Sequence, residues 1–404
     1  MFKKLEQLAL VLLLILIAAM GCQNDQILAP TAPAEEEVAG TQSENGKPIE
    51  GQYIVVFDKK EVLPFRLGKV AMISKAEAAI QKLTEDYQIS KYAILQKYHR
   101  SLQGFTARLT DEQLSRLKKD KRVSYIEQDR IITLGKKPRP PRGGGNVSQT
   151  TPWGITRIGG ATDGTGKTAW VLDTGVDFDH PDLNVDVSRS ATFITKGKDS
   201  KTADDFNGHG TNVAGIIAAI DNNIDVVGVA AGATIVAVKV LDRTGSGTYS
   251  GVIAGVDYVA KNASSGDIAN MSLGGPISKA LDDAVQNAAD AGVIFAIAAG
   301  NESDDANNFS PARVEHSNVF TISAFDKLDN FASFSNWSNP PIEFSAPGVY
   351  ILSLYKNGGT STMSGTSQAT PHVAGLLLIT NGNPKTDGYV NNDPDGDADP
   401  IAHK

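Results

Sequence analysis

The sequence of 404 residues contains a single cysteine, Cys22. One cysteine excludes an intramolecular disulfide, and it excludes a thiolate cluster that could hold zinc. The net charge of −8 lacks the basic excess of a general nucleic-acid-binding protein, so no nucleic-acid partner is expected. The 39 glycines follow no Gly-X-Y period, and a hydrophobic content of 41% excludes a disordered chain. At this length, two or three folded units are expected.

The charges are divided unevenly along the chain. Residues 1–146 carry 23 Lys and Arg against 17 Asp and Glu, a net +6, whereas residues 147–404 carry 15 against 29, a net −14. Separate domains with these charges would attract each other. We therefore expect a basic N-terminal part to dock on an acidic C-terminal part.

The N-terminus has the pattern of an export signal. Two lysines precede an unbroken apolar run at residues 8–20, which is short for a membrane span and typical of a signal-peptide core. The run ends in AAMGC, which resembles a bacterial lipobox with Cys22 as the lipidation site, although Ala19 stands where a larger aliphatic residue is usual. A plain secretory signal is the alternative. In both cases we expect an exported protein with a signal peptide over 1–22 and a flexible tether over 23–50.

Residues 51–134 predict a small α+β domain in which no residue looks catalytic. Its β-α-β-α-β order is compatible with a ferredoxin-like split βαβ fold. Residues 135–150 are a linker by composition. The expected elements are a strand over 53–57, a helix opened by a capping box at 74–77 and ending near 89, a strand over 101–109, a helix opened by a second capping box at 110–113, and a strand over 123–126.

From Thr168 onward, short apolar runs alternate with helical patterns. This alternation predicts an α/β fold, in which a parallel sheet is flanked by helices. Parallel sheets carry their functional groups beyond the carboxyl ends of the strands, and Asp173, Ser272 and Asn301 each follow an expected strand. The expected strands are 169–172, 233–240, 268–272 and 293–297, and the expected helices are 250–262 and 278–291.

Three short segments carry the candidate chemistry: VLDTGVD around Asp173, NGHGTNVAG around His209 and SGTSQATPHVAG around Ser367. Taken singly, these residues could be a turn aspartate, a helix-start histidine and an N-cap serine. Taken together, they predict a nucleophilic site. A serine hydroxyl needs a base to remove its proton, a histidine can take that proton, and an aspartate can orient the imidazole and stabilise its charged form.

These motifs, in the order Asp, His, Ser, resemble the signatures of the subtilisin-like serine proteases (subtilases), and within them the proteinase K branch. The resemblance covers about residues 151–380, and residues 53–132 resemble the inhibitory pro-domain of that family. It implies a subtilisin-like catalytic domain over 151–381 and an inhibitory pro-domain over 51–134. It further implies a monomeric serine endopeptidase that acts on protein and peptide substrates and uses no cofactor for its chemistry.

The resemblance also implies further site residues. Asn301, in the segment AAGNE, is expected to stabilise the oxyanion with the Ser367 N–H, although a turn residue or a glycosylation sequon would give the same pattern. Small side chains around the site imply a roomy pocket that favours apolar or aromatic residues before the cleaved bond, and Glu302 at its rim suits basic ones. The residues expected to bind substrate are Ser272, Leu273, Gly274 and Gly300.

Three departures from the family pattern stand out. The chain has Asn212 where a histidine is usual, and Gln368 in place of the readily oxidised methionine after the nucleophile, which predicts resistance to peroxide. Only 37 residues follow Ser367, which makes stabilisation by structural calcium an attractive option. Glu343 falls where proteinase K-like enzymes place a ligand carboxylate. The acidic tail over 382–404 is either solvated acid or a calcium-binding segment.

These expectations describe a zymogen whose pro-domain serves as intramolecular inhibitor and chaperone. Self-cleavage is expected within 127–150, with Leu134 an attractive residue before the cut. If Cys22 is lipidated, the membrane anchor belongs to the pro-domain, and cleavage would release the protease to the periplasm or the extracellular space. The alternative is a catalytically silent binding protein, or an enzyme held permanently inhibited.

Overall fold

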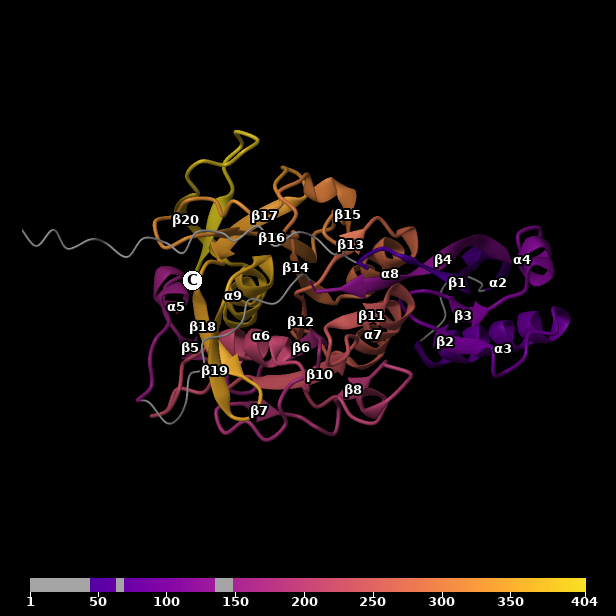
Figure 1. The fold of residues 1–404 in the computed structure, drawn as a ribbon, viewed down its shortest axis with the longest axis horizontal. Coiled ribbons are helices and arrows are strands. Elements are labelled where there is room, and N and C mark those ends of the chain that lie inside the picture. Colours follow the sequence, from indigo (N-terminus) through magenta and orange to yellow (C-terminus); the bar gives the residue numbers. More distant parts are fainter. Residues whose placement is uncertain (1–43, 63–68, 135–147) are drawn as a thin grey trace, which may run out of the picture. The chain divides into compact units, whose positions relative to one another are not determined.

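The computed structural model describes residues 44–62, 69–134 and 148–404 (Figure 1). The expected signal peptide with Cys22, and residues 135–147 of the expected linker, lie outside these ranges. Among the described residues, no helix combines the length and the apolar character that a membrane span requires.

The first domain is an antiparallel sheet with helices. Its own four strands lie in the order β4-β1-β3-β2, and its core includes Val55, Ile80 and Phe105. Strand β2 was not expected, and it completes a β-α-β-β-α-β arrangement. The elements are β1 (Pro48–Phe57), α2 (Lys59–Val62), α3 (Lys69–Asp86), β2 (Ile94–Tyr98), β3 (Gly104–Arg108), α4 (Asp111–Leu117) and β4 (Val123–Thr133).

One of the two expected capping boxes is present. Gln113 N donates to Thr110 Oγ1 at 3.2 Å and Thr110 N donates to Gln113 Oε1 at 3.1 Å, so α4 begins as predicted. The capping box at 74–77 is wrong because α3 already begins at Lys69. Residues 69–73 contain neither glycine nor proline, so nothing local stops the helix from starting earlier.

The second domain is built on a sheet whose strand order is β20-β21-β17-β16-β14-β12-β6-β10-β7, with β8 also pairing β10. Its pairs are parallel except for β20–β21. The strands are β5 (Thr162–Asp163), β6 (Thr168–Asp173), β7 (Asn184–Val185), β8 (Ala191–Thr192), β9 (Ala230–Ala231), β10 (Thr234–Lys239), β11 (Ser246–Thr248), β12 (Ile268–Met271), β13 (Gly275–Pro276), β14 (Ile294–Ala298), β15 (Phe309–Ser310), β16 (Val319–Phe325), β17 (Ile342–Pro347), β18 (Ile351–Tyr355), β19 (Gly359–Met363), β20 (Lys385–Tyr389) and β21 (Pro400–His403). The helices are α5 (Trp153–Arg157), α6 (His209–Ala218), α7 (Tyr249–Asn262), α8 (Lys279–Asp290) and α9 (Thr366–Ile379), with short 3₁₀ turns at Lys198–Ser200 and Ala306–Asn308.

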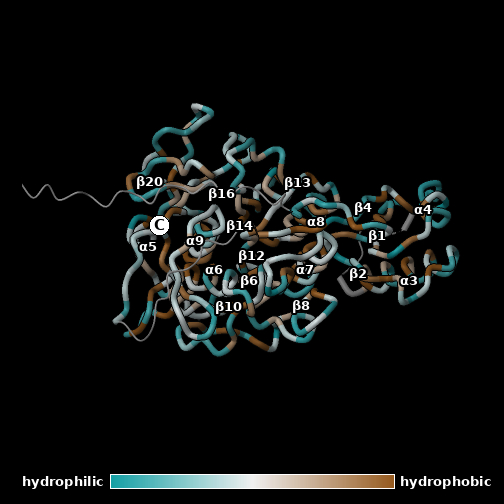
Figure 2. Tube along the Cα trace, in the orientation of Figure 1, coloured by the Kyte–Doolittle hydropathy of each residue, from teal (hydrophilic) through white to brown (hydrophobic). Residues whose placement is uncertain are grey.

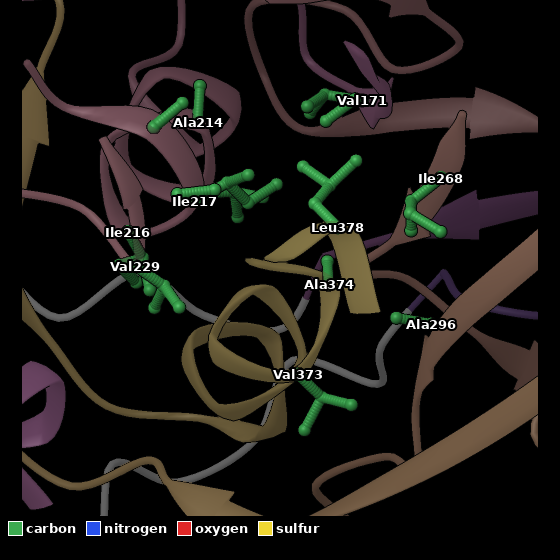
Figure 3. Close-up of a cluster of buried hydrophobic side chains, with 14 of the residues drawn as sticks. Val171, Ala214, Ile216, Ile217, Val229, Ile268, Ala296, Val373, Ala374 and Leu378 are labelled. Atoms are coloured by element: carbon green, nitrogen blue, oxygen red, sulfur yellow. The ribbon is translucent and has the colours of Figure 1, made fainter. Parts of the chain in front are cut away.

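Both faces of this sheet are covered by helices. Along β6, Ala169 and Val171 join the core formed with α6 and α9, whereas Trp170 and Leu172 join the core formed with α7 and α8. Figure 3 shows side chains of α6, α9, β6, β12 and β14 gathered in the first of these cores. Hydrophobic segments follow the inner strands, and hydrophilic ones follow the outer turns (Figure 2). The predicted α/β fold with a parallel, helix-flanked sheet is therefore confirmed.

The C-terminal segment was expected to be an acidic tail, either solvated or calcium-binding, and it contains two strands instead. Strand β21 joins the central sheet in parallel to β17 through the pair Ser345 and Ile401, and Ile401 is only 1% exposed. Strand β20 and the loop at 394–397 are exposed. The apolar residues of β21 cover a sheet edge, and that gain outweighs the preference of the surrounding acids for water.

Candidate active site

The first predicted site residue, Asp173, ends β6, an inner strand of the central sheet between β12 and β10. Its carboxylate is fully buried, and Oδ1 accepts the N–H of Thr174 at 2.7 Å. Burying an ionised carboxylate is costly unless hydrogen bonds replace its water, so the position needs a further donor.

That donor is His209, the first residue of α6. Its Nδ1 lies 2.8 Å from Oδ1 and 2.9 Å from Oδ2 of Asp173. With Nδ1–H donating to the carboxylate, Nε2 is the ring nitrogen left to accept a proton. Gly208 precedes the histidine with φ +109°, and a Cβ there would lie 2.3 Å from the Tyr355 ring, so only glycine fits.

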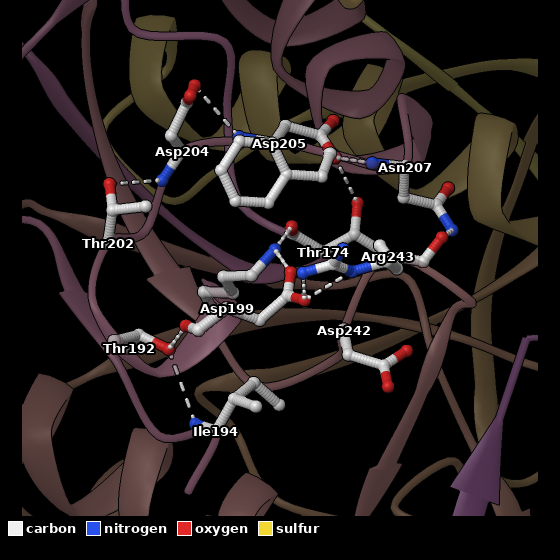
Figure 4. A network of polar contacts seen from close by, with 12 residues as sticks. Thr174, Thr192, Ile194, Asp199, Thr202, Asp204, Asp205, Asn207, Asp242 and Arg243 are labelled. Atoms are coloured by element: carbon white, nitrogen blue, oxygen red, sulfur yellow. Dashed lines mark hydrogen bonds and ion pairs between the residues drawn. The ribbon is translucent and has the colours of Figure 1, made fainter. Parts of the chain in front are cut away.

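A buried acid that sequence reasoning missed holds the turn before His209. Asp205 Oδ1 accepts the N–H group of Asn207 at 2.8 Å (Figure 4). It also accepts the N–H of Gly208 at 2.8 Å, and Oδ2 accepts the Thr211 N–H at 3.0 Å. Thr174 Oγ1 donates to Asp205 Oδ1 at 3.0 Å, which ties this turn to the loop after Asp173. Burial raises the pKa of Asp205. Its position two residues before Asn-Gly-His was the available signal, because Asp commonly accepts such N–H groups.

Below this turn, a buried ion-pair network was also missed. Lys239 is fully buried, donates to the carbonyl of Thr174 and pairs with Asp199 at 3.1 Å. Arg243 pairs with the other Asp199 oxygen at 2.8 Å, and both cations lie within 6 Å of the Phe206 ring. No local sign of this network is present in the sequence. Lys239 ends an apolar strand, and its partner Asp199 lies 40 residues away in the chain.

Ser367 is the second residue of α9 and exchanges two hydrogen bonds with Ser272. Its Oγ–H donates to Ser272 O at 3.0 Å, and its carbonyl accepts Ser272 Oγ–H at 2.8 Å. The carbonyl is available because Pro371, four residues later, has no N–H for the helix. Ser367 and His209 line the same cavity, although the recorded bond of the hydroxyl goes to Ser272 rather than to His209.

Asn301 follows β14 and faces the start of α9. Its Oδ1 accepts Thr366 N at 2.8 Å and Thr366 Oγ1 at 3.1 Å. Because the amide oxygen is held in this way, Nδ2 is the donor that remains for an oxyanion, together with the Ser367 N–H. Gly300 has φ +111°, and a Cβ there would lie 2.2 Å from Asn336 Nδ2.

The cavity has a volume of about 320 Å³ and brings the predicted residues together. Ser272, Leu273, Gly274 and Gly300 line it with His209, Asn301 and Ser367. Glu302 also lines it and accepts Asn336 Nδ2 at 2.8 Å. Apolar walls come from Ala298, Ala299, Phe309, Ala312, Phe334 and Met363.

The last strand of the first domain enters this cavity. Strand β4 pairs antiparallel with β11, and Leu134 N donates to Gly245 O at 2.9 Å and lines the cavity. The opposite edge is reached by another segment, because Asn45 Nδ2 donates to Gly274 O at 3.3 Å while its Oδ1 accepts Thr133 N at 3.1 Å. A side-chain amide from the N-terminal arm, rather than the backbone of β4, therefore meets Gly274.

Acidic side chains make the main polar contacts between the two domains, on both sides. Glu127 Oε2 accepts Ala280 N at 3.0 Å, and Asp129 Oδ1 accepts Ser250 N at 3.1 Å, so each caps the first turn of a helix in the second domain. Burial raises the pKa of Asp129. The expected attraction between the opposite net charges of the two domains stays a prediction.

On the other side, the second domain supplies Asp257 of α7, which is 1% exposed. One of its oxygens accepts Arg100 N at 2.6 Å and Ser101 N at 2.8 Å, and both oxygens lie 3.2 Å from His99 N. Ser101 Oγ adds a bond at 3.2 Å, and Lys261 pairs with the carboxylate at 2.5 Å. One buried carboxylate thus binds a whole turn of the first domain.

Glu343, the expected metal ligand, follows the first residue of β17 and lies in a largely apolar surrounding. Its Oε2 accepts Thr321 N at 2.6 Å, and burial, with the nearby charges of Glu315 and Asp399, raises its pKa to about 8. The metal-ligand role of Glu343 stays a prediction. Across the described ranges, no group of three or more His, Cys, Asp or Glu side chains could hold a metal ion.

Comparisons with known proteins match both domains. The Subtilase family model matches residues 164–391, and the peptidase inhibitor I9 model matches residues 52–135. Alkaline serine exoprotease A of Vibrio alginolyticus is 41% identical over 343 residues, which is 82% of this chain but only 60% of that protein. Proteinase R of Parengyodontium album is 36% identical over 365 residues, covering 86% of this chain and 85% of that protein. A cold-adapted subtilisin-like serine proteinase of known crystal structure is 46% identical with a TM-score of 0.50, covering 56% of this chain and 84% of that one.

Proposed function

The chain belongs to the subtilase family of serine proteases and carries an I9 inhibitor pro-domain, and on this premise we propose that it is an exported endopeptidase made as a self-processing zymogen. The observation that carries the proposal is the contact of His209 Nδ1 with the Asp173 carboxylate, at 2.8 Å, beside a cavity that Ser367 also lines. The insertion of β4 along β11 supports the zymogen part of the proposal.

In the proposed mechanism, His209 Nε2 takes the proton of Ser367 Oγ as the oxygen attacks the substrate carbonyl. Asp173 holds the imidazole tautomer and stabilises the imidazolium. The Ser367 N–H and Asn301 Nδ2 donate to the oxyanion, and the imidazolium gives its proton to the leaving amine. Water then hydrolyses the acyl-enzyme by the same steps. To reach His209, the hydroxyl of Ser367 exchanges its present acceptor, Ser272 O, for the imidazole.

The lining of the cavity supports a broad specificity. Alanine and phenylalanine side chains form much of its wall, which favours apolar or aromatic residues before the scissile bond. Ser272, Leu273 and Gly274 offer backbone groups to an extended substrate, which gives affinity without a sequence requirement. Glu302 at the rim adds a site for basic side chains.

A fluorophosphonate probe tests the proposal, since only an activated serine reacts with it covalently. The matured wild-type protein should be labelled on Ser367, Ser367→Ala should not be labelled, and the surface variant Ser188→Ala should behave like wild type. A wild-type chain that stays unlabelled after its pro-domain is removed would instead support a silent binding protein.

We further propose that cleavage falls within 127–150, near Leu134, and that a lipidated Cys22 anchors the precursor. In that case the anchor stays with the pro-domain, and the protease leaves the membrane on cleavage. Fractionation of wild type and Ser367→Ala tests this, because only the uncut variant should keep its catalytic domain in the membrane fraction. N-terminal sequencing of the soluble form locates the cut.

The proposed chemistry needs no cofactor. Structural calcium, with Glu343 as a candidate ligand, stays a prediction from the family. Unfolding midpoints of Ser367→Ala with calcium and with a chelator would test it directly, since a bound ion raises the midpoint with its concentration.

A further inference from the structure

The general base and the nucleophile stand on the first turns of two different helices. His209 opens α6 and Ser367 lies at the start of α9, so the packing of these helices sets the spacing between the two side chains. Farther along, apolar side chains of both helices share one core, in which Ile217 and Leu378 face each other (Figure 3). Apolar packing is not directional, so it does not by itself fix the distance between the first turns of α6 and α9, where His209 and Ser367 stand.

At the catalytic end, the helices are joined by a pair of side-chain amides. Gln368 Nε2 donates to Asn212 Oδ1 at 3.3 Å, and the two residues are 1% and 0% exposed. Within the described part of the chain, it is the one hydrogen bond that links a side chain of α6 to a side chain of α9. Asn212 lies three residues after His209 on the same helix, and Gln368 directly follows Ser367.

The asparagine end of this pair is fixed by the β18–β19 hairpin. Asn212 Nδ2 donates to Leu354 O at 3.1 Å and to Ser361 O at 3.3 Å. Its own carbonyl accepts Ser353 Oγ–H at 2.7 Å. These bonds use both amide protons of Asn212, so Oδ1 is held in place as the acceptor for Gln368.

The glutamine end is packed against the turn that supplies an oxyanion donor. Gln368 N donates to Gly365 O at 3.0 Å, and a Cβ on Gly365 would lie 3.0 Å from Gln368 Oε1 and 3.6 Å from Ser367 N. The carbonyl of Gln368 accepts Nδ1–H of the fully buried His372 at 2.8 Å. A shift of the Gln368 side chain would therefore disturb the turn at Gly365, which lies two residues before Ser367.

We propose that Asn212 and Gln368 form one positioning pair, which sets the spacing of His209 and Ser367. The proposal rests on the proposed protease function, and neither residue is assigned a contact with the reacting atoms. A buried amide that loses its partner is left unpaired, so the helices relax toward another spacing. A misplacement of about 1 Å at a catalytic centre costs roughly 100-fold in rate.

The test changes the length of the bridge without changing its chemistry. Asn212→Gln lengthens it by one methylene, Gln368→Asn shortens it by one, and the double swap restores the total. The exposed Asn383→Gln controls for the substitution itself. Each full-length chain is self-processed, its active sites are counted with a fluorophosphonate, and kcat and KM are measured on a peptide amide. Unfolding midpoints are measured on a Ser367→Ala background, which prevents self-digestion.

We expect each single variant to lose about 10- to 100-fold in kcat, or to self-process that much more slowly, with KM within about threefold. The double swap should recover to within about fivefold of wild type, although its unfolding midpoint need not exceed those of the single variants. The proposal would be overturned if the losses in kcat of the two single variants multiplied in the double variant. It would also be overturned if the losses in kcat followed the unfolding midpoints. A wild type that the fluorophosphonate does not label would refute the protease function itself.

Discussion

Replacing Asp257 should weaken inhibition by the pro-domain while leaving catalysis intact. The carboxylate accepts three backbone N–H groups from residues 99–101 and the hydroxyl of Ser101, at 2.6–3.2 Å. Truncating one partner of such a buried, hydrogen-bonded charge costs about 2–5 kcal/mol of binding free energy. Asp257→Ala should therefore raise the inhibition constant by roughly 30- to 5,000-fold. Asp257→Asn, which keeps the shape and loses the charge, should fall between Ala and wild type.

The assay titrates the mature enzyme with a separate chain of residues 44–134, which has a hydrophobic core of its own. Hydrolysis of a short peptide reports both the inhibition constant and the uninhibited rate. The matched control is Asp290→Asn on α8, whose recorded partner is His316 of the same domain. Ser101→Ala, made in the pro-domain chain, removes one bond only and should have a smaller effect than Asp257→Ala.

The refuting results follow from the same contacts. An inhibition constant that changes less than threefold for Asp257→Ala would mean that the turn at 99–101 does not contribute to the docked complex. If Asp290→Asn changed the inhibition constant as much as Asp257→Asn, the effect would come from the net charge of the domain and not from the contact of Asp257. A parallel loss of uninhibited kcat/KM would mean that Asp257 supports the fold of the active site rather than the docking of the pro-domain.

Three further outcomes are expected. Asn301→Ala should lower kcat by about 10²- to 10³-fold with little change in KM, the usual effect of removing one oxyanion donor, and a change under tenfold would argue against that role. Activity should survive mild peroxide, because Gln368 cannot be oxidised as methionine can. Met363 lines the cavity, so any slow loss of activity should disappear in Met363→Leu. A rapid loss of activity in that variant would contradict the reasoning. Burial raises the pKa of Glu343 from 4.5 to about 8, so the folded state binds the proton more tightly than the unfolded state and stability should fall as pH rises between these values. Glu343→Gln should flatten that dependence in unfolding midpoints measured from pH 5 to 9, and an unchanged slope would contradict it.

Much of the site was predictable because its signals are local. Asp173 ends an apolar strand, and His209 and Ser367 begin helices, so strand and helix patterns placed each residue at an element boundary. The capping box at Thr110 was equally local, with both of its bonds within four residues. The capping box at 74–77 failed because the same spacing also occurs inside a helix, where nothing in the pattern distinguishes the two cases. Strand β2 was missed because its residues alternate only weakly, with four of the five half-exposed or exposed.

The sequence alone determined the order of the elements, the motifs and the residues at the strand and helix ends, because these depend on neighbours a few positions away. Tertiary structure alone decided the polar contacts between distant parts of the chain. Asn45 reaches Gly274, Asp257 binds the pro-domain, and Gln368 meets Asn212 across two helices. In each of these three contacts the partners are more than 150 residues apart, and chain spacing carries no record of such distances. Only the packing of the sheet and helices brings them together, since a buried polar group takes whichever partner the fold places within hydrogen-bonding reach.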